Sequence, residues 1–545
     1  MSSLPSLQVL ANNRDALLLA EVAAWLHDIG KFCNLHIEAH ANGGTRKWAN
    51  DHAYKAIVDN PAAQIRLDGS TKKPDALKNI LNAGSPKAAD FLDNHLKDFL
   101  TNTSLTILGE TYTLAELIML GTPGFATAPN RSNLLDGKPG WLPAVLGVCH
   151  NEAHVDKQDP AKGEGMQTWP NVYISSAFGF EEEKVIVDNS PNSLDARLKN
   201  LQVPPRRESL LNELVYGLGD TRQPVNEVLL SDWAWIVAAL FKSALAGALV
   251  KNQQFTIRQW KSWKDKIIEH DLRWRLLRVN FDTLSLYVKA IKIADIRAYQ
   301  DAVEQACQQI KHLVEEEYPL GNEIYRDTSG IYFTFPDLDL PADLEQEIRR
   351  RVENVEPELA PHIAVTVGDG ATAQDQIKGI LDKARGEAIK ALKHPFDAHN
   401  FSAHWGQAWG NRRDEKKWEI CPVCGLYPKL ESDEVCEHCD KRRKSRLQTW
   451  QKNPKQTIWL GEIANHNDRV ALLVGKFGLE GWLSGDLVQT MLVTALENDP
   501  AGCTPKNPSP ARLRRIWETC EGFWTQIVEG EILPQKIAHR SRKLI

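Results

Sequence analysis

The stretch NEIYRDTSGIYFTFP (322–336) predicts two short strands joined by a Thr-Ser-Gly turn. Before it come a β-like run, WRLLRVNF (274–281), and a segment with helical periodicity (294–318). After it come a helix with proline near its first turn (341–355), a strand (362–370) and a final helix (373–392). The resulting order, β-α-β-β-α-β plus a helix, is the ferredoxin-like order.

The composition is that of a multidomain protein without a general basic field. A chain of 545 residues is too long for one ordinary core, so we expect several domains. Its hydrophobic content of 42% and charged content of 25% are typical of soluble globular proteins. The formal net charge is −6, so any binding of nucleic acid would have to come from local patches.

Three features predict a cytoplasmic protein without a membrane span. The N-terminus lacks the basic start and cleavage site of a signal peptide. The most apolar stretch (233–250) contains Lys242 and follows Asp232, so we expect a buried helix. Five of the nine cysteines are scattered, which does not suit a disulfide framework and indicates a reducing cytosol.

The other four cysteines form two tight pairs, CPVCG (421–425) and CEHCD (436–440). Each pair can present two thiolates to one tetrahedral ion, and the loop between them is long enough to close the site. Two disulfides or four unrelated cysteines are the alternative. We expect a structural Zn²⁺ that is not catalytic, with His438 a poorer ligand than the cysteines. The predicted ligands are Cys421, Cys424, Cys436 and Cys439.

A basic run, KRRKSR (441–446), follows the second cysteine pair directly. Such a run is usually a solvated face. Beside a zinc knuckle it could also contact a phosphate backbone. Both interpretations stand for the basic residues of the run, which are Lys441, Arg442, Arg443, Lys444 and Arg446.

The stretch AAWLHDIGKF (23–32) places His27 and Asp28 at the end of an apolar run. An imidazole and a carboxylate are a normal ligand pair for Mn²⁺, Fe²⁺, Ni²⁺ or Zn²⁺. A carboxylate can also bridge two ions, which suits phosphodiester hydrolysis, and Lys31 could meet the phosphate. The alternative is a histidine and an aspartate that are hydrogen-bonded inside a core.

A metal site needs further ligands, and three histidines are the main candidates. His52 is one candidate. His150 and His154 stand at i and i+4 of a predicted helix and therefore share a face. The glutamate of this HNEAH string is one place too late for a zinc protease. Together these residues predict one or two divalent transition-metal ions.

The string LHDIGKF resembles the signature of HD-type metal-dependent phosphohydrolases. The ferredoxin-like order also occurs in the palm of nucleotidyl cyclases and polymerases, and fold alone does not fix function. The whole succession resembles the large subunit of type III CRISPR effector complexes. The stretches 229–245, 457–485 and 509–524 look most like the divergent type III-C kind. Members of this family are longer, so we expect a fragment or half of a split subunit.

With this resemblance, the expected fold is multidomain α+β. Its parts are a helical HD domain (1–203), a helical linker (204–270), a ferredoxin-like first palm (271–404), a zinc module with the basic run (405–454) and a partial second palm with helices (455–545). In the last part we expect a β-hairpin over 455–477 and a helix over 487–499.

The resemblance implies a single-stranded-DNA nuclease at His27 and Asp28. Permuted HD folds take ligands from later helices, so the resemblance also implies Asp232, before the apolar helix, as a further candidate ligand. The partners of the nuclease would be a guide RNA, other effector subunits and target RNA. Palms of this family often carry a Gly-Gly-Asp-Asp hairpin that makes cyclic oligoadenylate, and this sequence has no such string. Asp282 and Asp327 stand where palm carboxylates would, but one carboxylate at each place is a poor two-metal site. We therefore expect no cyclase activity.

Two alternatives to this function remain. The HD domain could hydrolyse nucleotides or cyclic oligonucleotides instead of DNA. The chain could also be a non-catalytic scaffold of the guide-RNA complex whose metal site is vestigial.

Overall fold

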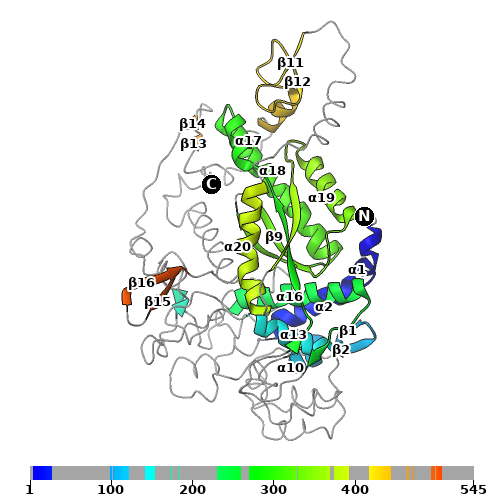
Figure 1. Ribbon diagram of the computed structural model, residues 1–545. Coiled ribbons are helices and arrows are strands. Elements are labelled where there is room, and N and C mark those ends of the chain that lie inside the picture. Colours follow the sequence, from blue (N-terminus) through cyan, green and yellow to red (C-terminus); the bar gives the residue numbers. More distant parts are fainter. Residues whose placement is uncertain are drawn as a thin grey trace, which may run out of the picture.

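A computed structural model (Figure 1) gives the structure of the chain. It describes residues 4–27, 98–100, 102–121, 141–153, 173–174, 183–184, 230–258, 269–327, 329–368, 373–391, 417–443, 463–464, 470–471, 493–496 and 499–505.

The predicted ferredoxin-like order is confirmed in the middle of the chain. Four antiparallel strands form a sheet in the order β10-β7-β9-β8. The strands are β7 (Trp274–Asn280), β8 (Glu323–Asp327), β9 (Gly330–Pro336) and β10 (His362–Val367), and the connecting helices are α18 (Ile293–His312) and α19 (Ala342–Val355). This part of the chain, residues 274–367, is called the ferredoxin-like unit below.

The structure of the unit departs from the predicted elements in two places. The helix predicted over 294–318 ends at His312, and a π-helical turn, η3 (Leu313–Glu317), completes it. A short helix that periodicity did not predict, α17 (Thr283–Lys289), follows β7. The last predicted helix is present as α20 (Ala373–Ala391), which packs on β7 and β10.

The tight turn between β8 and β9 depends on Gly330. A Cβ at this position would lie 2.2 Å from the carbonyl oxygen of Val279 on the neighbouring strand. Only glycine therefore allows β9 to start this close to β7.

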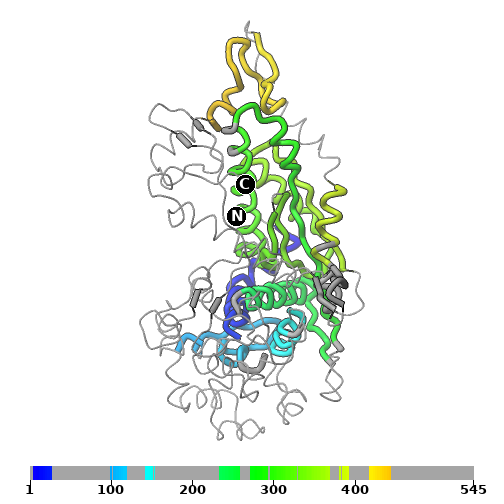
Figure 2. The backbone as a smooth tube through the Cα atoms, turned by 90° about the vertical axis from the view of Figure 1, so that its left-hand side faces the viewer, coloured from blue at the N-terminus to red at the C-terminus, as the bar shows by residue number. Residues whose placement is uncertain are grey.

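A helical layer packs against one end of the ferredoxin-like unit, and the two share one apolar core. Its elements are η1 (Pro5–Leu7), α1 (Gln8–Asn12), α2 (Arg14–Leu26), α10 (Leu114–Gly121), α13 (Trp141–Glu152) and α16 (Leu230–Lys251), with the hairpin of β1 (Ser104–Ile107) and β2 (Glu110–Thr113). Figures 1 and 2 show this layer at the opposite end of the unit from the cysteine-rich segment.

Helix α16 is the centre of this layer, since it contacts α2, α13 and the strands β8 and β9. Within it, Asp232–Lys251 is long and apolar enough to cross a membrane, but 94% of its most apolar window is buried inside the protein. The prediction of a buried helix is confirmed.

A buried ion pair joins α2 to α16. Lys242 Nζ lies 2.8 Å from Glu21 Oε2, and both side chains are almost fully buried. The ammonium also donates to the carbonyl oxygen of Glu315 in η3, at 3.1 Å. The second carboxylate oxygen of Glu21 accepts from Asn322 Nδ2, just before β8, at 2.7 Å. One charge pair therefore ties α2 and α16 to the ferredoxin-like unit.

The remaining described strands form two-stranded antiparallel pairs. They are β3 (Tyr173–Ile174) with β4 (Glu183–Lys184), β5 (Ile257–Arg258) with β6 (Glu269–His270), β11 (Trp418–Ile420) with β12 (Pro428–Leu430), β13 (Ile463–Ala464) with β14 (Val470–Ala471), and β15 (Val493–Leu496) with β16 (Asp499–Pro505).

The strands near the C-terminus confirm one prediction and correct another. The pair β13–β14 lies inside the hairpin predicted over 455–477. The helix predicted over 487–499 is wrong where the structure describes it, because Val493–Leu496 is a strand paired with β16. Valine and threonine favour extended backbone, and antiparallel pairing with β16 prevails over helical periodicity.

We expect Lys242→Met to destabilise the protein by about 3–5 kcal/mol, because it leaves the Glu21 carboxylate buried without its cation. Adding Glu21→Gln, which can still accept from Asn322, should recover most of this loss. Lys251→Met is the control, since its exposed pair with Asp337 is expected to contribute less than about 1 kcal/mol. Urea unfolding measures all three, and equal effects of the two lysine variants would contradict the account.

Candidate metal centres

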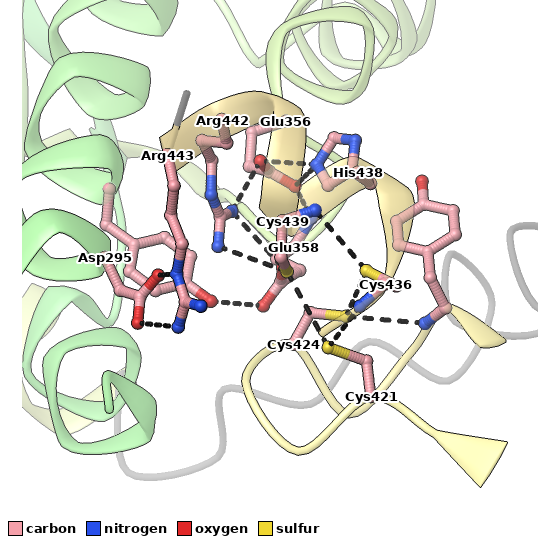
Figure 3. Close-up of polar contacts among 12 residues, drawn as sticks. Asp295, Glu356, Glu358, Cys421, Cys424, Cys436, His438, Cys439, Arg442 and Arg443 are labelled. Atoms are coloured by element: carbon pink, nitrogen blue, oxygen red, sulfur yellow. Dashed lines mark hydrogen bonds and ion pairs between the residues drawn. The ribbon is translucent and has the colours of Figure 1, made fainter. Parts of the chain in front are cut away.

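The four predicted zinc ligands come together in a small module, residues 417–443, called the cysteine module below. Each cysteine of the first pair faces one cysteine of the second pair. Cys421 Sγ lies 3.9 Å from Cys439 Sγ, and Cys424 Sγ lies 3.8 Å from Cys436 Sγ. All four sulfurs lie within 4.8 Å of one another, and all four residues are buried. Figure 3 shows them converging on one point.

The backbone forms two knuckles that hold these sulfurs. In the first, the carbonyl oxygen of Cys421 accepts from the N–H of Gly425, which has the left-handed φ of 66° that glycine adopts freely. In the second, Cys436 accepts in the same way from Asp440. Backbone N–H groups also donate to sulfur, for example Cys436 N to Cys421 Sγ at 3.3 Å. Such donors favour the thiolate form that binds metal.

The sulfur geometry fits one tetrahedral Zn²⁺. With Zn–S bonds of about 2.3 Å, neighbouring sulfurs must lie about 3.8 Å apart. The observed distances match, and they are far too long for disulfides. His438 points away from this centre, with Nε2 3.0 Å from Glu356 Oε2. Four thiolates complete the coordination sphere, so the ion would be structural.

The first residues of the basic run contact carboxylates within the protein. Arg442 pairs with Glu356 at 2.8 Å, and Arg443 pairs with Asp295 at 2.7 Å. Lys441 pairs with Glu437 in its own module and remains exposed. Lys444 and Arg446 lie outside the described residues.

The second centre begins with His27, at the C-terminal end of α2. Its Nδ1 lies 2.5 Å from the carbonyl oxygen of Ala24, which can only accept, so Nδ1 carries the proton. In the neutral imidazole, Nε2 then has the lone pair. A backbone carbonyl on the far nitrogen is the usual support of a metal-ligating histidine. The side chain is fully buried.

His150, near the end of α13, meets His27 across the helical layer. Its Nδ1 lies 2.6 Å from His27 Nε2, and the two rings are perpendicular with centroids 4.9 Å apart. Two nitrogens on one ion stand about 3 Å or more apart, given metal–nitrogen bonds of about 2.1 Å. A small outward shift of the rings would therefore let both bind one metal.

Asp232 belongs to the same neighbourhood through its helix. It lies in the first turn of α16 and is buried. The next residue, Trp233, has its ring 5.2 Å from that of His150. Among the described residues, however, only the four cysteines form a metal-binding group of three or more close ligands.

The other residues predicted for this centre lie outside the described residues. They are Asp28, Lys31, His52 and His154. His270, which the sequence did not single out, lies beside Glu152 at the end of α13. His270 Nε2 is 3.6 Å from Glu152 Oε1, and both side chains are largely buried. Burial, with the nearby Glu152 carboxylate, holds the pKa of Cys149 well above its ordinary value, so this thiol stays protonated.

Asp282, which follows β7, and Asp327, at the end of β8, each accept hydrogen bonds from a nearby serine. Asp282 caps α17, accepting from the Ser285 N–H at 3.0 Å and from its hydroxyl at 2.6 Å. Asp327 accepts from the Ser329 N–H at 2.8 Å and from its hydroxyl at 2.6 Å. In the part of the chain that the structure describes, Asp282 therefore caps a helix and Asp327 is bonded to Ser329.

No family model matches the chain, and no curated protein matches it either. Solved structures of Csm1–Csm4 do, at 13% identity. They are the apo cassette (TM-score 0.37; 76% of this chain, 55% of that chain), the subcomplex in the type III-A CRISPR-Csm interference complex (0.40; 95% and 70%) and the cassette in complex with cA3 (0.32; 77% and 56%). This chain thus spans little more than half of the first of these chains. All three TM-scores are low, so no function is assigned to this chain from these structures.

We expect the purified protein to hold one zinc ion at the cysteine module. Cys436→Ser should abolish it, because three thiolates no longer complete the tetrahedral set. Cys307→Ser is the matched control, since Cys307 is equally buried but lies in α18. Elemental analysis by plasma mass spectrometry decides it, and a Cys436→Ser protein with unchanged zinc would contradict the assignment.

Proposed function

We propose that the chain is the large subunit of a type III CRISPR effector complex, and that its His27–His150 centre cleaves single-stranded DNA with a divalent metal. The observation that carries the proposal is the meeting of these two imidazoles, buried and 2.6 Å apart from positions 123 residues apart in sequence. The sequence predicted both as ligands of one site.

The supporting residues suit a metal ligand set. The Ala24 carbonyl fixes the proton of His27 on Nδ1 and so keeps the Nε2 lone pair directed at His150. A bound divalent ion would supply Lewis acidity, lowering the pKa of water and stabilising charge on the phosphodiester. In this proposal Asp28 adds a carboxylate ligand, Asp232 supports the site from α16, and Lys31 contacts the phosphate.

The ferredoxin-like unit is a non-catalytic palm in this proposal. Asp282 and Asp327 act as a helix cap and in a turn, and the chain has no Gly-Gly-Asp-Asp string. The proposed partners are guide RNA, target RNA and other effector subunits. The sequence resembles type III-C most, and we propose the assignment for type III as a whole.

We expect His27→Ala/Asp28→Ala and His150→Ala to lose metal-dependent cleavage of labelled single-stranded DNA. The loss should exceed the roughly 10- to 100-fold that removing an outer-shell partner of a metal ligand costs. His312→Ala, on the half-exposed end of α18, is the control and should cleave like the wild type.

Equal cleavage by the wild type and the His27/Asp28 variant would contradict the nuclease assignment. Cleavage of cyclic oligoadenylates but not of DNA would instead favour the nucleotide hydrolase. Absence of both activities, with capture of guide RNA and partner subunits intact, would favour the scaffold.

A further inference from the structure

The cysteine module is attached to the ferredoxin-like unit by a charged interface (Figure 3). The unit contributes two buried carboxylates, Asp295 in the first turn of α18 and Glu356 just after α19. Arg443 donates two hydrogen bonds to the Asp295 carboxylate, of 2.7 and 2.8 Å. Arg442 and His438 both reach Glu356, at 2.8 and 3.0 Å. If the module moved away, both carboxylates would lose these partners.

Arg442 links this interface directly to the metal-binding sulfurs. One end of its guanidinium bonds Glu356, and Nη2 lies 3.7 Å from Cys439 Sγ. Its flat face covers the ring of Tyr299 in α18, with 4.3 Å between the guanidinium carbon and the ring centre. One side chain therefore contacts a sulfur of the quartet, a carboxylate and an aromatic ring of the unit.

The Tyr299 hydroxyl extends the network by donating to Glu358 at 2.7 Å. Burial and the neighbouring Glu356 charge raise the pKa of Glu358 to about 8. Burial opposes ionisation of Glu356 too, but bonds from His438 and Arg442 outweigh it and hold its pKa below the ordinary value. Beside Tyr299 the unit therefore presents the ionised Glu356 carboxylate to Arg442 and His438 of the module.

Metal loading sets the geometry and charge of the module's side of this interface. A Zn²⁺ ion with four thiolates carries a net charge of −2, which the Arg442 guanidinium offsets. Without the ion the four sulfurs are no longer held in one tetrahedral arrangement, so the position of Arg442 beside Cys439 is less constrained. His438 lies between Cys436 and Cys439 in sequence, and Arg442 follows by one helical turn. The second knuckle therefore orients both side chains towards Glu356.

We propose that metal binding at the cysteine quartet and docking of the cysteine module onto the ferredoxin-like unit are coupled through Arg442 and Arg443. Each event strengthens the other by the same factor, because linkage between two equilibria is reciprocal. Loss of the ion releases the module, and loss of the docking contacts weakens the ion. The basic residues Arg442 and Arg443 act here as a metal-dependent latch inside the chain. The inference depends only on the zinc site and is independent of the nuclease proposal.

The first arm of the test changes the unit and measures the metal. Zinc release from the loaded full-length protein to an excess of a chromogenic chelator gives the rate. Glu356→Gln keeps the shape of the side chain but removes its charge, and Asp295→Asn does the same opposite Arg443. Both should release zinc faster, within the 5- to 150-fold range of typical coupling. Lys441→Gln, an exposed residue of the same helical turn, should match the wild type.

The two acidic variants separate coupling from a local effect. Asp295 bonds Arg443 and two backbone N–H groups of its own helix start, so faster release in Asp295→Asn requires undocking of the module. If only Glu356→Gln releases zinc faster, the effect is confined to the Arg442 hydrogen bond and docking coupling is overturned. Release at the Lys441→Gln rate in both variants overturns it as well.

The second arm uses the wild type and needs no variant to fold. Removal of zinc by a chelator should raise amide hydrogen exchange in the unit at residues 292–299 and 355–359. The strand β9, away from the interface, should not change. Exchange that rises only within residues 417–443 would show that the module loses its metal and stays docked, which contradicts the proposal.

Discussion

The buried pair of Lys242 and Glu21 is the constraint on which the arrangement of this chain depends. A charge with no solvent around it must keep its partner, so α2 and α16 cannot slide past each other without a large cost. Trp25 and Trp235, stacked with centroids 6.0 Å apart, fix the neighbouring turns of the same two helices. The end of α2 that carries His27 therefore lies beside the start of α16. His150 then meets His27 from α13 and touches Trp233 of α16.

The same principle governs how the chain uses its basic residues. Arg349, Arg350 and Arg351 form a run on α19, yet each pairs with a glutamate of this chain. Arg442 and Arg443 do so as well, across the interface with the cysteine module. Runs of arginine in this sequence thus serve internal pairing as much as any external ligand. This agrees with the absence of a general basic field in the composition.

The sequence predicted those parts of the structure that depend on local pattern. The strands and helices of the ferredoxin-like unit and the cysteine quartet follow from periodicity and spacing. His27 was predicted as a ligand because it stands beside Asp28 at the end of an apolar run, and His150 because it shares a predicted helix face with His154. The sequence did not predict that Arg442 meets Glu356, because such pairing depends on the tertiary fold. The strand at Val493–Leu496 was missed because short apolar runs suit either helix or strand.

Crystals grown with Mn²⁺ test most directly the proposal that His27 and His150 hold a divalent ion. The account predicts an anomalous peak between the two rings, about 2.1 Å from His27 Nε2 and from His150 Nδ1. The rings would then stand further apart than the 2.6 Å that now separates their nitrogens. No peak there, with the imidazoles still hydrogen-bonded to each other and the cysteine module fully loaded with zinc, would contradict it.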